Sequence, residues 1–136
     1  MSAAVAVRQP PLDAVLAAHD RLLEAYGGSG GVRSPGGVEA ALARAEQLRA
    51  YADEAPSIFA LAAALGYAVV RIHHTFVDGN KRTGLYATVA ALWMNGWRLD
   101  AAESETADMF ERLAAGEVEE AALAAWLERH AALREP

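Results

Sequence analysis

Ten residues at positions 74–83 constrain the fold of this chain most strongly, because they lie between two long runs without charge. Their sequence, HTFVDGNKRT, holds an imidazole, a carboxylate, an amide and two cations. The flanking runs at 55–70 and 83–97 contain no Asp, Glu, Lys or Arg. Both are shorter than the roughly 20 residues that a membrane-spanning helix needs. We therefore expect two buried helices that are joined by a polar loop.

The spacing of apolar residues supports the first of these helices. From about Ser57 onward, large apolar side chains recur every three or four residues, as in a packed helix: Ile58, Leu61, Leu65, Val69 and Ile72. The second helix would follow Asp78-Gly79-Asn80, which has turn chemistry, and Asn80 is a good N-cap. The sequence thus predicts a helix-loop-helix unit over residues 57–95.

The polar loop of this unit has the groups that phosphate chemistry requires. Lys81 and Arg82 would lie in the first helical turn, where unpaired N–H groups and the helix dipole already favour an anion. Two cations there cost stability unless an anion binds, which indicates a phosphate. Asp78 could hold Mg²⁺ beside the phosphate oxygens, and His74 could take a proton from an incoming hydroxyl. Together these groups indicate phosphoryl or nucleotidyl transfer.

Four further helices are expected around the central unit, which makes the chain an all-α domain of about six helices with almost no strand. They are expected at about 11–26, at 34–51, around Thr106 to Leu113, and around Leu123 to His130. Ser34 and Pro35 have the residue types of an N-cap and a first helical position. Asn95-Gly96 and Gly116 are stop signals, and 97–100 is expected to be a short extended segment.

Two of these expectations concern side-chain environment. The first helix should bury one face, formed by Leu12, Val15, Leu16, Leu22, Leu23 and Tyr26. In the second helix, Arg44 should face water. The glycine-rich segment 27–31 lacks the Gly-Lys-Ser/Thr of a P-loop and is interpreted as a flexible connector.

Composition limits the classes of partner. The 136 residues are over half apolar and can form a single domain over 1–136, with 1–9 as a flexible N-terminal segment that lacks signal-peptide form. The net charge of −6 argues against a nucleic-acid partner. There is no cysteine, which suits a reducing cytoplasm. We expect a cytoplasmic protein with no membrane partner.

The pattern His-x-Phe-x-Asp-Gly-Asn-Lys-Arg-Thr at 74–83 resembles the signature of the Doc (death-on-curing) toxins, a branch of the Fic superfamily. The similarity extends to Tyr26-Gly27-Gly28, and to Ser34-Pro35-Gly36 followed by Glu39-Ala40-Ala41. It covers roughly residues 10–131, which is nearly the whole chain. The resemblance implies the helical Fic/Doc fold, and it makes the segment before the central unit, at 52–56, a candidate for the flap that docks the target in that superfamily.

Three positions bear on which reaction the resemblance implies. Fic enzymes that transfer AMP have a glycine where this chain has Lys81 and a second arginine where it has Leu85. Doc toxins carry the lysine and present the γ-phosphate of ATP, so the resemblance implies phosphorylation of a protein hydroxyl. The Doc signature has alanine or glycine where this chain has Gly79, and the glycine departs from the Doc sequences with alanine and matches the AMP-transferring branch. AMP transfer at the same site therefore stays an alternative.

The resemblance also assigns roles and partners. His74 would be the catalytic base, Asp78 would bind Mg²⁺, and the phosphates of ATP would be held by Gly79, Asn80, Lys81 and Arg82. The expected target is a threonine of elongation factor Tu, whose modification stalls translation. The chain has no Ser/Thr-x-x-x-Glu pattern of the self-inhibited Fic proteins. Restraint is therefore expected from a small antitoxin whose C-terminal segment folds into a groove on this chain.

A second alternative uses different residues. A metal-dependent phosphohydrolase of the HD type could combine His19-Asp20 with His73 or His74 and a later carboxylate such as Asp108, although the order of the motifs is reversed. The roles of His19 and His73 stay open. A core histidine with one hydrogen-bond partner is the preferred interpretation of His19.

Overall fold

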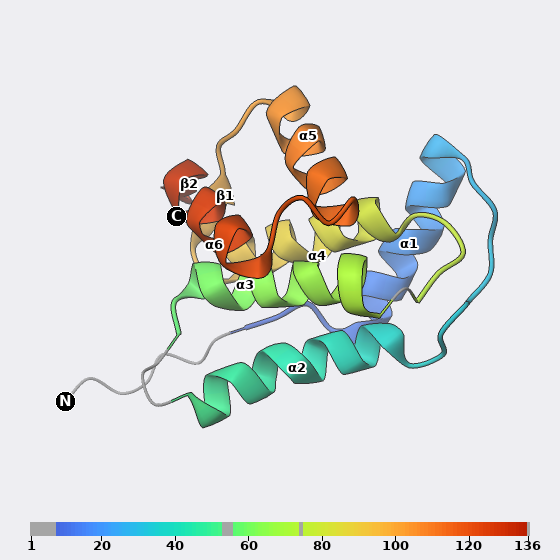
Figure 1. The fold of residues 1–136 in the computed structure, drawn as a ribbon, viewed down its shortest axis with the longest axis horizontal. Helices are drawn as coiled ribbons and strands as arrows, with labels where there is room; N and C mark the ends of the chain where they lie inside the picture. Colours follow the sequence, from blue (N-terminus) through green and yellow to red (C-terminus); the bar gives the residue numbers. More distant parts are fainter. Residues whose placement is uncertain (1–7, 53–55, 74, 136) are drawn as a thin grey trace.

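The structure is a computed structural model that describes residues 8–52, 56–73 and 75–135. These residues form six α-helices, one π-helical segment and two short strands, arranged around α3 and α4 (Figure 1). The elements are α1 (Leu12–Tyr26), α2 (Gly37–Tyr51), α3 (Ile58–Tyr67), η1 (Ala68–Ile72), α4 (Asn80–Met94), β1 (Trp97–Leu99), α5 (Glu103–Ala114), α6 (Glu120–His130) and β2 (Ala131–Leu133). The prediction of an all-α fold is confirmed.

The two central helices approach each other closely because small residues lie where they cross. A Cβ atom on Gly66 would overlap the hydroxyl of Thr88, and one on Gly84 would overlap a methyl group of Val70. Large apolar side chains then fill the space around this pair and are fully buried, among them Leu65, Leu92, Leu113, Leu123 and Leu127. The uncharged runs are therefore the centre of the core, as their sequence predicts.

One position of the predicted apolar stripe is wrong, because the end of the first central helix is not α-helical. Ile72 is 45% exposed, whereas Val70 is buried. Residues 68–72 form the π-helix η1, which ends with His73 donating its N–H to the carbonyl of Ala68 (2.8 Å). A π turn contains more residues than an α turn. The extra residue rotates Ile72 out of the core just before the polar loop.

The inner face of α1 also differs from the prediction. Val15, Ala18 and His19 are buried. Leu16 and Tyr26, which were expected inside, are exposed. The reason is that α1 packs beside α2 and α4 near the N-terminal end of α4, so its buried stripe is narrow and contains small residues.

The start of α2 is determined by tertiary contacts and not by Ser34 as an N-cap. The helix begins at Gly37 after Gly36, which adopts φ +80°. The N–H groups of Arg33 and Ser34 instead donate to the carbonyl of Thr75 (2.6 and 3.0 Å). Segment 33–34 is thereby held against the polar loop, and the N-cap prediction is wrong for this reason.

Arg44 does not face water as predicted. Its guanidinium donates to Glu120 on α6 (2.6 Å) and to the carbonyl of Ala64 on α3 (3.2 Å). The side chain is only about one third exposed, so the ion pair links α2, α3 and α6 across a partly buried seam.

The C-terminal elements follow the sequence signals. Helix α4 stops at Asn95-Gly96, α5 buries Thr106, Met109, Phe110 and Leu113, and α6 buries Leu123, Trp126 and Leu127. Strand β1 lies within the predicted extended segment and pairs antiparallel with β2, with Trp97 opposite Leu133. Among the described helices, none is long and apolar enough to cross a membrane.

Candidate active site

The polar loop between η1 and α4 lies at one end of the central helix pair. Residues 75–79 of this loop are called the site loop below. His74, the predicted base, lies outside the described residues. The described neighbours on both sides are tightly held: Thr75 is buried, and its hydroxyl donates to the carbonyl of His73 (2.8 Å).

The loop that precedes α2 packs along the site loop. Val77 donates its N–H to the carbonyl of Gly31 (3.2 Å), and two successive N–H groups at 33–34 donate to Thr75. Val32 forms an isolated antiparallel bridge with Phe76. The glycine-rich segment that was interpreted as a flexible connector is therefore part of the framework that fixes the site loop.

Helix α4 presents an open N-terminus at the end of the site loop. Its N-cap residue is Gly79, with φ +88° and no side-chain cap. The first backbone bond of the helix is donated by Thr83 to the carbonyl of Gly79 (2.9 Å). Within the described residues, the N–H groups of Asn80, Lys81 and Arg82 have no acceptor. Three donors and the positive end of the helix dipole therefore face outward at this point.

Asn80 was predicted to be the N-cap, and this is wrong. It lies in the first turn of α4, and its side chain bonds both backbone groups of Phe76, accepting from the N–H (3.2 Å) and donating to the carbonyl (2.8 Å). The cap position instead requires a left-handed backbone, which glycine adopts without strain. Asn80 thus closes the site loop onto the helix.

The two cations of the first turn have protein partners. Lys81 Nζ lies 2.6 Å from Glu111 Oε1 on α5, and the Arg82 guanidinium lies 4.4 Å from the ring centroid of Tyr26 on α1. Lys81 at the start of α4 and Glu111 in the last turn of α5 each oppose the dipole of their own helix. Their pairing offsets both costs. Because the two side chains are 47% and 65% exposed, this ion pair is weak and accessible to a competing anion.

Asp78 is fixed through one carboxylate oxygen and leaves the other open. Oδ2 accepts the N–H of Ser29 (2.8 Å), whereas Oδ1 has no hydrogen bond within the described residues. Gly28 makes the approach possible, because a Cβ atom there would lie 3.2 Å from the Cβ of Asp78. Mg²⁺ usually takes one or two carboxylates and completes its shell with phosphate oxygens and water. Asp78, an exposed residue just before the N-terminus of α4 with one carboxylate oxygen unbonded within the described residues, fits that requirement.

The side chain of His19 lies directly beneath the site loop. It is 3% exposed and stacks on Phe76 with a centroid distance of 3.5 Å and an interplanar angle of 10°. Its Nε2 lies 2.8 Å from the carbonyl oxygen of Asp78. The histidine has one close hydrogen-bond partner, as the preferred interpretation holds, and that partner belongs to the candidate site.

The alternative phosphohydrolase site has no support in the part of the chain that the structure describes. His19 Nδ1 lies 3.7 Å from Asp20 Oδ1, but its Nε2 is bonded to the backbone. Among residues 8–52, 56–73 and 75–135, no three His, Cys, Asp or Glu side chains gather as a metal ion would need. The proposed flap at 52–56 cannot be placed, because 53–55 lie outside the described residues.

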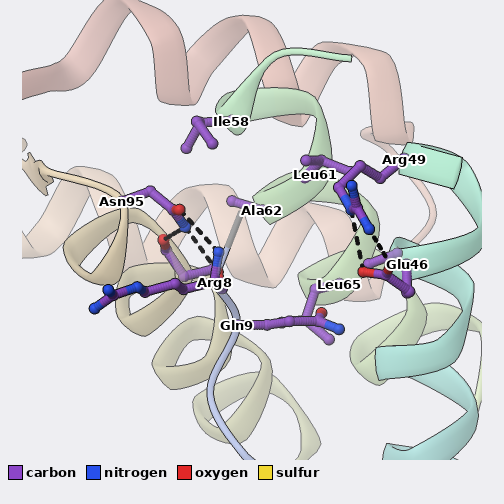
Figure 2. A pocket seen from close by; sticks show the side chains of 11 residues that line it. Arg8, Gln9, Glu46, Arg49, Ile58, Leu61, Ala62, Leu65 and Asn95 are labelled. Atoms are coloured by element: carbon purple, nitrogen blue, oxygen red, sulfur yellow. Dashed lines mark hydrogen bonds and ion pairs between the residues drawn. The ribbon is translucent and has the colours of Figure 1, made fainter. Parts of the chain in front are cut away.

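A small cavity lies between α2, α3 and α4, away from the site loop (Figure 2). Its volume is about 20 Å³, which is room for about one water molecule. Arg8 closes it through paired bonds with Asn95, donating its N–H to Oδ1 (3.0 Å) and accepting from Nδ2 (2.7 Å). This cavity is too small for a nucleotide. The two bonds to Asn95 anchor residue 8 to the end of α4.

Comparison with known proteins shows the family to which this chain is similar. The model of the Fic/DOC family matches residues 9–92, a span that contains α1 to α3, the site loop and most of α4. A relative in Escherichia phage P1, named protein kinase doc, is 34% identical to this chain over 115 residues. The match covers 85% of this chain and 89% of that protein. Glu111, the partner of Lys81, lies beyond the family match.

Proposed function

This chain belongs to the Fic/DOC family, and we propose that it is the toxin of a toxin-antitoxin pair that transfers the γ-phosphate of ATP to a protein hydroxyl. The observation that carries the proposal is the open N-terminus of α4: within the described residues three N–H donors there have no acceptor, two cations lie in the same turn, and Asp78 precedes the helix by two residues. The name of the phage relative, protein kinase doc, supports the same chemistry.

In the proposed reaction, the phosphates of ATP bind at Gly79, Asn80, Lys81 and Arg82. Asp78 would hold Mg²⁺, which supplies charge neutralisation for the phosphate oxygens. His74 takes the proton of the target hydroxyl, whose oxygen forms a bond to the γ-phosphorus. The bond from that phosphorus to the β,γ-bridging oxygen breaks, and ADP leaves. Backbone donors that are already oriented stabilise the charge that develops during transfer.

The structure weakens the main argument for AMP transfer. Gly79 matches the AMP-transferring branch, but its φ of +88° is strained for any other residue, and a Cβ atom there would lie 3.2 Å from the His19 ring. In this chain, local backbone geometry and packing also favour the glycine. Lys81 and Leu85 then remain as the positions that distinguish the two reactions, and both favour transfer of the γ-phosphate.

The proposed target is a threonine of elongation factor Tu in the bacterial cytoplasm, and the proposed restraint is a small antitoxin. Inducible expression of the free protein in a bacterial host tests both. We expect growth arrest and, by mass spectrometry, a phosphate on elongation factor Tu, and we expect co-expression of the cognate antitoxin to restore growth. Unimpaired growth with abundant folded protein would contradict the toxin assignment.

The ion pair between Lys81 and Glu111 gives a first quantitative prediction. Exposed ion pairs contribute about 0.2–1 kcal/mol, so freeing Lys81 with Glu111→Gln should tighten Mg·ATP binding by about 1.4- to 5-fold. Isothermal titration calorimetry measures the change. Glu128→Gln on α6, which removes the same charge from an exposed side chain, is the control and should leave affinity unchanged. Equal or weaker binding by Glu111→Gln would show that Glu111 does not compete with phosphate.

A further inference from the structure

His19 is a buried polar side chain to which the proposed reaction gives no role. It lies in the middle of α1, nearly sixty residues before the site loop in sequence, and its exposure is 3%. Its ring covers one face of Phe76. Phe76 is buried and is held on its backbone by Asn80, the first residue of α4. A continuous set of contacts therefore runs from α1 through the site loop to the phosphate-binding helix.

The hydrogen bond of His19 fixes which ring nitrogen carries a proton. A carbonyl oxygen can only accept, so Nε2 must be the donor to Asp78. The other nitrogen, Nδ1, lies 3.7 Å from the carboxylate of Asp20, whose side chain is 83% exposed. This distance is too long for a hydrogen bond. The bond from Nε2 to Asp78 is thus the specific polar contact of the ring, and Nδ1 has no comparable role.

Two hydrogen bonds hold Asp78 in place, as is needed for a residue that binds a cation. The Ser29 N–H fixes Oδ2 of the carboxylate, and His19 fixes the backbone carbonyl of the same residue. The next residue, Gly79, packs against the His19 ring and turns the chain into α4. Loss of the bond to the carbonyl would release this turn, and the carboxylate would move relative to the three N–H donors of α4.

We propose that His19 is a positioning residue that holds Asp78 in the geometry that binds the Mg²⁺ of Mg·ATP. This inference rests on the proposed function. A ring that only fills the core would be replaced without loss by another aromatic ring. A positioning role depends on a hydrogen-bond donor at the position of Nε2. The core-filling role and the positioning role therefore predict different outcomes for matched substitutions.

Three substitutions separate the stack from the hydrogen bond. His19→Phe keeps an aromatic ring on Phe76 and removes the donor. His19→Gln loses the ring but places an amide N–H near the position of Nε2, whereas His19→Asn places it near Nδ1. Leaving a buried acceptor unpaired is costly. We expect Phe and Asn at this position to weaken Mg·ATP binding by roughly tenfold, and Gln to stay within about threefold of the wild type.

Binding is measured by calorimetry at several Mg²⁺ concentrations, since a displaced Asp78 should raise the Mg²⁺ requirement. Hydrogen exchange in the free protein provides a second measurement that needs no activity. The amides of Phe76 and Val77, which are bonded in the structure, should exchange faster in His19→Phe and be restored in His19→Gln.

The outcomes distinguish this inference from the proposed function. If the wild type binds Mg·ATP and His19→Phe binds it equally well with unchanged exchange, His19 is a core residue only and the inference is wrong. If the wild type binds no Mg·ATP, the proposed function fails, and the exchange of Phe76 and Val77 still decides whether His19 holds the loop. A loss in His19→Gln equal to that in His19→Asn would also contradict the inference.

Discussion

Replacing His74 by alanine should lower the rate of phosphate transfer by about 10²–10⁴-fold, the usual contribution of a general base. The affinity for Mg·ATP should stay within about twofold, because the proposed phosphate and cation contacts come from Asp78 and the start of α4 and not from the imidazole. The turnover number at saturating Mg·ATP and the calorimetric dissociation constant measure the two quantities separately.

The neighbouring histidine is the matched control. His73 is half-buried at the end of η1, and within the described residues its side chain makes no hydrogen bond or ion pair, so His73→Ala should keep turnover within about threefold. An inactive His73→Ala beside an active His74→Ala would exchange the roles of the two histidines. If His73→Ala and His74→Ala had equal turnover, the assignment of a histidine as general base would be wrong.

Replacing Gly37 by alanine should reduce both stability and activity, although this residue is far in sequence from the ten residues at 74–83. A Cβ atom on Gly37 would overlap the Thr75 hydroxyl and lie 3.0 Å from the carbonyl oxygen of His73. The hydroxyl cannot turn away, because it is buried and bonded to that same carbonyl. Either α2 or the backbone on both sides of His74 must move.

Overpacking of this kind costs about 1–3 kcal/mol. For a domain of this size, we expect the melting temperature to fall by roughly 3–10 °C. Because a displacement of the base by 1 Å can reduce turnover about 100-fold, the loss of activity should exceed what the unfolded fraction explains.

Gly30→Ala is the control for Gly37→Ala. Gly30 lies in the loop before α2, no atom lies within 4 Å of an added Cβ, and its φ is not in the left-handed region. The melting temperature and turnover of Gly30→Ala should equal those of the wild type within error. A Gly37→Ala protein as stable and active as Gly30→Ala would show that α2 does not position the site loop.

The local signals in the sequence predict the central unit well. The uncharged runs at 55–70 and 83–97 supply α3, the start of η1 and most of α4, and the Asn95-Gly96 stop lies where α4 ends. These features depend on apolar spacing and on residues with strong turn preferences, which act within a few positions of each other. For the same reason, the position of the two cations in the first turn of α4 follows directly from residues 74–83, although the N-cap is Gly79 and not Asn80.

The remaining features depend on contacts between distant segments. The π-helix that turns Ile72 outward has no signature in the apolar pattern. Ser34 has the residue type of an N-cap, but the tertiary bonds of 33–34 to Thr75 determine where α2 begins. Glu111 carries no sequence signal for its contact with Lys81, because the contact depends on where α5 packs. The roles of Ser29 and His19 likewise required the relative placement of three segments.

The transfer of labelled phosphate tests the central claim most directly. The purified protein is incubated with Mg²⁺, elongation factor Tu, and ATP that carries the label at either the α- or the γ-phosphate, with His74→Ala as the control. We predict label on elongation factor Tu from the γ-position only, and its loss in the control. Label from the α-position would make the protein an AMP transferase, and no label from either position would contradict the proposed reaction with this target.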